Sequence, residues 1–205
     1  MTGPGAGADA AAAPAARTSP DRAASALFSF LDGSGTRIVF AESCTGGLAA
    51  AALTELPGSS RVLWGGIVSY TEEAKTAILG IPQASIDSFG VVSVEIAGAM
   101  AKGALAASGA ASVAAGVAGG DGAPGGPGRG ADFAAAVTGY AGPDAPGSEG
   151  NPGRVCFAWA SRTGALRTEE RRFEGSRHAI REAACLRLLE GALEFCAGER
   201  GGERY

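Results

Sequence analysis

The segment ESCTGG (residues 42–47) places a hydroxyl and a thiol where a catalytic nucleophile could lie. It directly follows an apolar run and opens a segment with helical periodicity, so its backbone N–H groups would suit an anion or a developing oxyanion. Ser43 is the candidate nucleophile and Cys44 is its rival. Two structural interpretations stay open, because Ser43 or Thr45 could simply cap the helix, and a cysteine is often a small buried apolar residue.

The residues around Ser43 are candidates for substrate binding. Gly46 and Gly47 have no side chain, so a ligand could approach their backbone closely. We expect both glycines to contact the substrate together with Glu42 and Thr45. The N–H groups of Thr45 and Gly46 are the expected donors to an oxyanion.

A second segment, SYTEEAK (residues 69–75), supplies a candidate base in a chain that has only two lysines. Lys75 falls in the first turn of a predicted helix, where the helix dipole and any burial would lower its pKa. Glu72 and Glu73 would raise that pKa, so the direction of the shift stays open. Lysine can lose its proton and act as a base, whereas arginine hardly can. The alternative is a solvated surface lysine.

A serine with a lysine base is a known arrangement for acyl transfer. The competing pair of Ser43 with His178, the chain's single histidine, is less favoured because a histidine at the start of a helix is more often solvated. Tyr70 could stack on a ring or donate a hydrogen bond to an oxyanion; the alternative is an aromatic residue with its hydroxyl in water.

A glycine-rich segment and three arginines complete the candidate site. Thr138 and Gly139, in VTGYAGP (residues 137–143), could present a hydroxyl and N–H groups, although the segment could equally be a tight turn. Arg177 and Arg181 are four residues apart on one helical face and, with Arg154, could hold a phosphate. The alternative for the arginines is an exposed, salt-bridged face.

These segments lie at the ends of predicted strands. Hydrophobic patterning predicts strands at 36–41, 62–70, 132–137, 155–161 and 166–173, and helices at 21–30, 44–56, 71–79, 93–108 and 175–197. The alternation predicts an α/β fold, a three-layer α/β/α sandwich with a mixed, mainly parallel sheet. In such sheets, ligands bind at the carboxyl ends of the strands.

Length and composition limit the remaining possibilities. The 205 residues suit one domain, which we place at residues 21–198, with disordered or frayed tails at 1–20 and 199–205 and a flexible Gly/Pro insertion at 116–130. The net charge of −4 argues against nucleic acid and membrane surfaces as partners. Four cysteines without CxxC spacing argue against a structural metal site. With neither a signal peptide nor a spanning segment in the sequence, we expect a soluble cytoplasmic protein.

Five segments together resemble one family. They read AESCTGGLAAAALTELPGSS, GGIVSYTEEAKTAILGI, FGVVS, VTGYAGP and FEGSRHAIR, in this order. Their types and order are similar to the C-terminal domain of the CinA (competence/damage-inducible) proteins over roughly residues 24–196. Such an ordered set is far more specific than a lone glycine motif.

The resemblance implies a function. Members of this family include nicotinamide mononucleotide deamidases (PncC type), which use no cofactor and release nicotinate mononucleotide and ammonia in pyridine nucleotide recycling. By resemblance, Ser43 is the nucleophile and Lys75 its base, Tyr70 lies beside the nicotinamide, and Thr138 with the loop after it forms a wall of the pocket. The chain is also similar to the stand-alone form of this domain.

Other functions stay open beside the deamidase. The chain could be a catalytically inactive nucleotide-binding protein that acts through a partner. A scaffold role in DNA uptake or damage response is implied only by the family's name, and the acidic charge balance argues against direct DNA contact. The apolar stretches of the helix at 94–108 and the resemblance both favour a homodimer.

Overall fold

A five-stranded mixed sheet forms the centre of the molecule in the computed structural model, which describes residues 19–114, 130–142 and 151–202. The strands lie in the order β2-β1-β3-β4-β5. β1 pairs in parallel with β2 and β3, whereas β4 is antiparallel to both β3 and β5. Four strands therefore run in one direction, which confirms the predicted mixed, mainly parallel sheet. The strands are β1 Ile38–Glu42, β2 Leu63–Val68, β3 Phe133–Gly139, β4 Arg154–Ser161 and β5 Leu166–Arg172.

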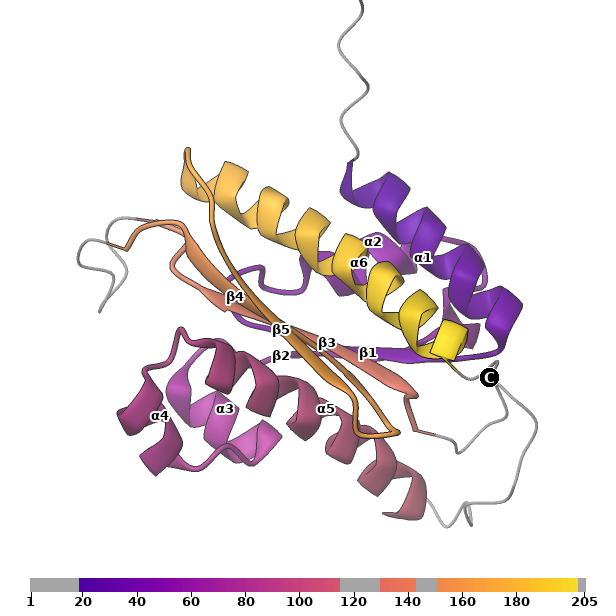
Figure 1. Ribbon diagram of the computed structural model, residues 1–205, viewed down its shortest axis with the longest axis horizontal. Coiled ribbons are helices and arrows are strands. Elements are labelled where there is room, and N and C mark those ends of the chain that lie inside the picture. The colour runs from indigo at the N-terminus through magenta and orange to yellow at the C-terminus, as the bar shows by residue number, and fades with distance from the viewer. Residues whose placement is uncertain (1–18, 115–129, 143–150, 203–205) are drawn as a thin grey trace, which may run out of the picture.

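Helices cover both faces of the sheet, as predicted for a three-layer α/β/α sandwich (Figure 1). One face carries α1 Pro20–Ser34, α2 Leu48–Thr54 and α6 Arg177–Gly202, with the short 3-10 turn η1 Ser59–Arg61 beside α2. The other face carries α3 Glu72–Leu79, α4 Gln83–Phe89 and α5 Val94–Ala114.

The central strand β1 shows why the sheet needs two helical layers. All five of its residues are buried, and successive side chains point to opposite faces. Ile38 and Phe40 pack into the core under α1, α2 and α6, whereas Val39 and Ala41 pack into the core under α3, α4 and α5. A strand buried on both faces has no polar alternation, which explains its continuous apolar run.

Several element boundaries differ from those predicted. The helix predicted from residue 44 starts at Leu48, because residues 42–47 form a turn in which Gly46 and Gly47 have positive φ. The short helix α4, between Pro82 and Gly90, was not predicted. α6 continues to Gly202, past the predicted frayed end at residue 199. Most of the predicted N-terminal tail and of the 116–130 insertion lies outside the described residues.

The apolar stretches of α5, which favoured a homodimer in the sequence, turn out to be used within the chain. Ile96, Ala97, Met100, Ala101 and Ala104 are buried against the sheet. They therefore give no support to a dimer, which stays a prediction from the resemblance. None of the helices in the described ranges is long and apolar enough to span a membrane.

The parallel strands bring three candidate segments to one edge. Because β2, β1 and β3 are adjacent and parallel, the segments after them, starting at Ser69, Ser43 and Tyr140, lie at the same end of the sheet. β4 runs the other way, so its first residue, Arg154, lies at that end too.

Candidate active site

Ser43 is held in place by the two strands that flank β1. Its N–H donates to Val137 O at 3.0 Å, and the N–H of Ser69 donates to Glu42 O at 2.9 Å. The chain then reverses in a tight turn closed by the Gly46 N–H, which donates to Ser43 O at 3.0 Å. The hydroxyl of Ser43 thus projects from a turn that both neighbours fix.

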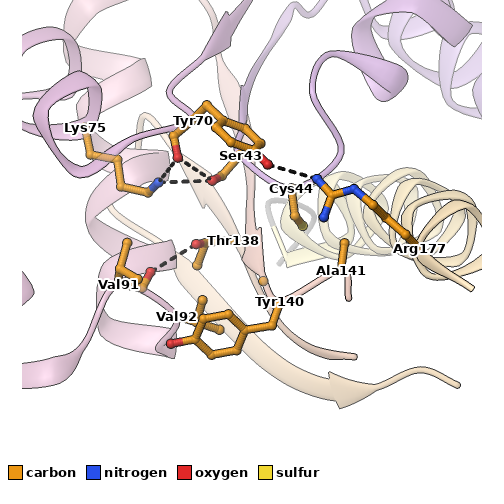
Figure 2. A pocket seen from close by; sticks show the side chains of 11 residues that line it. Ser43, Cys44, Tyr70, Lys75, Val91, Val92, Thr138, Tyr140, Ala141 and Arg177 are labelled. Carbon is orange, nitrogen blue, oxygen red and sulfur yellow. Dashed lines mark hydrogen bonds between the residues drawn. The ribbon is translucent and has the colours of Figure 1, made fainter. Parts of the chain in front are cut away.

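Lys75 reaches Ser43 from α3. Thr71 caps this helix, its hydroxyl oxygen accepting from Ala74 N at 3.2 Å, so Lys75 lies in the first turn as predicted. The Lys75 side chain is fully buried, and its Nζ lies 3.0 Å from Ser43 Oγ (Figure 2). Nζ also lies 2.9 Å from Ser69 O and 3.4 Å from Tyr70 O. The structure therefore joins the two catalytic candidates directly.

The surroundings of Lys75 favour its neutral form. Desolvation by burial lowers the pKa of Lys75, and the opposing contributions of Cys44 and Glu72 are smaller. The sequence left the direction of the Lys75 pKa shift open, and in the structure the pKa is lowered. No carboxylate in the described part of the chain forms an ion pair with this amine. A lysine in this state can accept the proton of a serine.

The two rival nucleophile arrangements are less suited to catalysis. Burial raises the pKa of the Cys44 thiol to about 12, so the sulfur keeps its proton near neutral pH. His178 lies on the surface, where its Nε2 is 3.4 Å from Glu182 Oε1, and it does not line the pocket.

A pocket of about 150 Å³ opens beside the dyad. Seven residues that the sequence analysis named as candidates or rivals line it: Ser43, Cys44, Tyr70, Lys75, Thr138, Gly139 and Arg177. The Thr138 hydroxyl donates to Val91 O at 3.0 Å, so it fixes the opposite wall. The pocket therefore brings together residues from α3, α6 and the ends of three strands.

Tyr70 and Arg177 form the outer rim of this pocket. Tyr70 is 56% exposed, and its hydroxyl oxygen accepts a hydrogen bond from Arg177 Nη2 at 2.9 Å (Figure 2). Within the described ranges, Arg177 forms no ion pair. Its charge is therefore available to an anionic group of a ligand.

Glu42 does not line the pocket, contrary to its predicted role in substrate binding. Its buried carboxylate accepts from the N–H groups of Gly47, Ala49 and Ala50 at 3.0–3.2 Å and from the Thr45 hydroxyl at 2.7 Å. The Glu42 carboxylate thus neutralises the positive end of the α2 helix dipole. The N-terminus of α2 is consequently not a free anion site.

Three further substrate-binding candidates also lie away from the pocket lining. Thr45 is fully buried, and Gly46 and Gly47 adopt φ values of +66° and +96°. These two glycines serve the conformation of the turn rather than close approach of a ligand. The Gly46 N–H, expected to stabilise an oxyanion, is used by Ser43 O.

Two of the three predicted phosphate-binding arginines have other partners. Arg154 pairs with Glu170 at 2.8 Å and donates to Val92 O at 3.0 Å. Arg181 donates to the carbonyl oxygens of Cys44 and Thr45. Arg177 is the one of the three that lines the pocket.

Four lining residues were not singled out by sequence reasoning: Val91, Val92, Tyr140 and Ala141. Val91 and Val92 belong to FGVVS, which carried the resemblance without an assigned role, whereas Tyr140 and Ala141 belong to the loop after Thr138 that the resemblance assigned to a wall of the pocket. Their positions inside those segments were the available signal. No group of three potential metal-ligating residues was found in the described part of the chain.

Comparisons with known proteins identify the family of the chain. Two relatives are the CinA-like protein of Mycobacterium tuberculosis, 42% identical over 167 residues, and that of Akkermansia muciniphila, 39% identical over 154 residues. These matches cover 80% and 75% of this chain but 34% and 32% of the relatives. The chain thus spans about a third of the length of the curated relatives it matches.

Solved structures are similar over most of their length. The competence/damage inducible protein CihA from Agrobacterium tumefaciens matches with a TM-score of 0.71 and 36% identity, over 85% of this chain and 95% of that one. A CinA superfamily protein from Escherichia coli matches with a TM-score of 0.70 and 31% identity, over 86% and 90%. The family model of the CinA C-terminal domain matches residues 21–130 and 127–196. The chain belongs to the CinA C-terminal domain family.

Proposed function

We propose that this protein is an amidohydrolase that deamidates nicotinamide mononucleotide to nicotinate mononucleotide and ammonia. The observation that carries the proposal is the buried Lys75 amine, with a lowered pKa, 3.0 Å from Ser43 Oγ at the wall of a pocket. A serine activated by a neutral lysine is an arrangement for acyl transfer. The choice of this amide substrate rests on the resemblance of the motifs.

A neutral Lys75 amine can make all three of its contacts. Its two N–H bonds can donate to Ser69 O and Tyr70 O, which leaves the nitrogen lone pair for the Ser43 hydroxyl proton. Lys75 takes this proton while Ser43 Oγ forms a bond to the carboxamide carbon. Collapse of the tetrahedral intermediate breaks the C–N bond, and Lys75 returns the proton to the departing ammonia. Water then hydrolyses the acyl-enzyme to the carboxylate and free Ser43.

The pocket offers groups for the rest of this substrate. Tyr70 at the rim can stack on the pyridinium ring, and the unpaired charge of Arg177 can meet the 5′-phosphate. The positive charge of the pyridinium draws electrons from the carboxamide carbonyl and makes its carbon more electrophilic.

Ammonia release from nicotinamide mononucleotide tests the proposal. We expect release by the wild type, with a loss of at least about 10³-fold in Ser43→Ala and in Lys75→Met. Cys44→Ala is the matched control, because it changes the neighbouring nucleophilic atom; its rate should stay within a few-fold of the wild type.

Three outcomes would contradict the proposal. Equal rates in all variants would remove Ser43 and Lys75 from the chemistry, and loss only in Cys44→Ala would make the thiol the nucleophile. Thermal stabilisation by nicotinamide mononucleotide without ammonia would instead support the nucleotide-binding alternative.

A further inference from the structure

Arg181 reaches from α6 to the turn that carries Ser43, where it contacts Cys44 and Thr45, which are 137 and 136 positions earlier in the sequence. Its Nε donates to Cys44 O at 3.1 Å and its Nη2 donates to Thr45 O at 2.7 Å. One guanidinium thus holds two consecutive carbonyl groups. Such a charge-assisted pair of contacts fixes geometry as well as adding energy.

Holding these carbonyls also fixes the N–H groups on the other side of the same peptide units. A peptide unit is planar and trans, so the Thr45 N–H points opposite to Cys44 O. Likewise, the Gly46 N–H points opposite to Thr45 O, and it closes the turn on Ser43 O. A cation on a carbonyl oxygen also polarises its peptide unit and makes the N–H a stronger donor.

The turn has few N–H groups left for an oxyanion. The Gly46 N–H is taken by Ser43 O, and the N–H groups of Gly47, Ala49 and Ala50 are taken by Glu42. Within the part of the chain that the structure describes, the N–H groups of Cys44 and Thr45 have no hydrogen-bond acceptor. Of the two, Cys44 lines the pocket and Thr45 is fully buried away from it. The Cys44 N–H, the first after Ser43, is therefore the one placed to meet the oxyanion of a tetrahedral intermediate bonded to Ser43 Oγ.

We propose that Arg181 is a positioning residue: by holding the Cys44 and Thr45 carbonyls, it fixes the turn that places Ser43 Oγ and the Cys44 N–H at the pocket. The inference rests on the proposed nucleophilic role of Ser43, and it replaces the phosphate-binding role predicted for Arg181 from sequence. Glu42 opposes Arg181 across the turn, since it holds the N–H groups that follow. The turn is therefore clamped between a buried carboxylate and a guanidinium.

The test measures the rate at which a fluorophosphonate probe labels Ser43, because this reaction needs the nucleophile and the oxyanion donors but no pyridine nucleotide. We expect Arg181→Lys and Arg181→Gln to slow labelling by about 10–100-fold, less than the roughly 10²–10³-fold for losing a donor outright. Arg200→Gln, an arginine-to-glutamine change at the other end of the same helix, whose guanidinium also donates to a backbone carbonyl (Ser34 O), should label at the wild-type rate. Guanidinium ion in the buffer should restore part of the rate to Arg181→Ala.

A second measurement compares ammonia release from nicotinamide mononucleotide and from nicotinamide riboside, which lacks the phosphate. Arg181→Gln should lower kcat on both substrates with KM unchanged, whereas Arg177→Gln should raise KM for the mononucleotide alone. Thermal unfolding shows whether each variant is folded, and rescue by guanidinium separates positioning from misfolding.

Each contrary result is distinct. Wild-type labelling rates in folded Arg181 variants, or no labelling of wild-type Ser43, would overturn the positioning role. A higher KM of Arg181→Gln for the mononucleotide alone would make Arg181 a phosphate ligand. If the Arg181 variants slow the labelling of Ser43 as expected but the wild type releases no ammonia, the positioning role stands and the proposed deamidase activity is refuted.

Discussion

Lys75 can act as a base because its ammonium form loses solvation in the protein. The amine is fully buried between α3 and the ends of two strands, and its oxygen neighbours are two carbonyls and one hydroxyl. Neutral dipoles of this kind stabilise an ammonium less than water does, so burial decides the direction of the pKa shift. The same desolvation makes the protonated form costly for folding.

Ammonia release should therefore rise with pH as Lys75 loses its proton, at a pH below its ordinary pKa of 10.5. The unfolded chain keeps this proton up to its ordinary pKa, while the folded chain loses it earlier. Between the two pKa values the unfolded state binds more protons, so stability rises with pH. Lys75→Met removes this cost, and it should raise Tm most below the folded pKa and progressively less above it.

Thermal unfolding across pH measures this difference, and Lys102→Met is the matched control because Lys102 is an exposed lysine on α5. The control should show no such pH-dependent gain. A constant difference in Tm between Lys75→Met and the wild type at every pH would contradict the lowered pKa.

For individual residues, the sequence predicted which residues belong to the site better than it predicted their hydrogen-bond partners. Ser43, Lys75 and Tyr70 were singled out, and the structure brings them to one pocket. The roles of Glu42 and Arg181 were not predicted, because each depends on hydrogen bonds to backbone groups of a turn. A sequence pattern shows a charged residue but not whether a buried backbone group reaches it first.

The contact between α6 and the sheet positions Arg177 and Arg181, the site residues that this helix carries. Gly191 lies directly over Trp159 of β4, and the indole N–H donates to Leu188 O at 3.0 Å. A Cβ at residue 191 would lie 2.1 Å from Trp159 Cζ2, well inside contact distance. α6 can therefore lie close to β4 only with glycine at this position. The same helix carries Arg177 and Arg181 to the pocket end of the sheet.

Gly191→Ala should destabilise the fold by about 1–3 kcal/mol, because α6 or the buried indole must move to admit the methyl group. Gly198→Ala is the matched control on the same helix, where a Cβ would meet nothing within 4 Å. That change should be neutral or stabilise by up to about 1 kcal/mol through helix propensity. Urea unfolding measures both, and equal effects of the two substitutions would show that α6 does not need the close approach.

At the scale of elements, long apolar runs were predicted well and short helices poorly. β1, β3 and β4 are buried strands whose apolar runs give a clear signal. α4 has seven residues and one buried side chain, Ile86, so it presents hardly any helical periodicity. The start of α2 was misplaced because Glu42, six residues earlier, replaces the usual N-cap side chain.

Charged residues line β5, the strand at one edge of the sheet. Arg187 from α6, only 7% exposed, pairs with Glu169 of β5 and Glu194 of α6. Arg187 and Arg167 also lie over the Trp159 ring, at 5.2 and 4.3 Å from its centroid. This charged cluster joins β5, β4 and α6, so it connects the edge of the sheet to one helical layer.

The cluster predicts how the whole fold responds to acid. The hydrogen bond from Arg187 lowers the pKa of Glu169 to about 2, from an ordinary 4.5. The resulting stabilisation is complete above the ordinary pKa and is lost as pH falls towards 2; it amounts to about 3 kcal/mol before solvent screening reduces it. Glu169→Gln should therefore be less stable than the wild type at pH 7, with the gap closing between about pH 5 and 2, whereas Glu182→Gln, at an exposed helical pair with His178, should follow the wild type throughout. Urea unfolding at stepped pH measures both variants, and a gap that persists at pH 2 would mean that Glu169 contributes through packing and not through its charge.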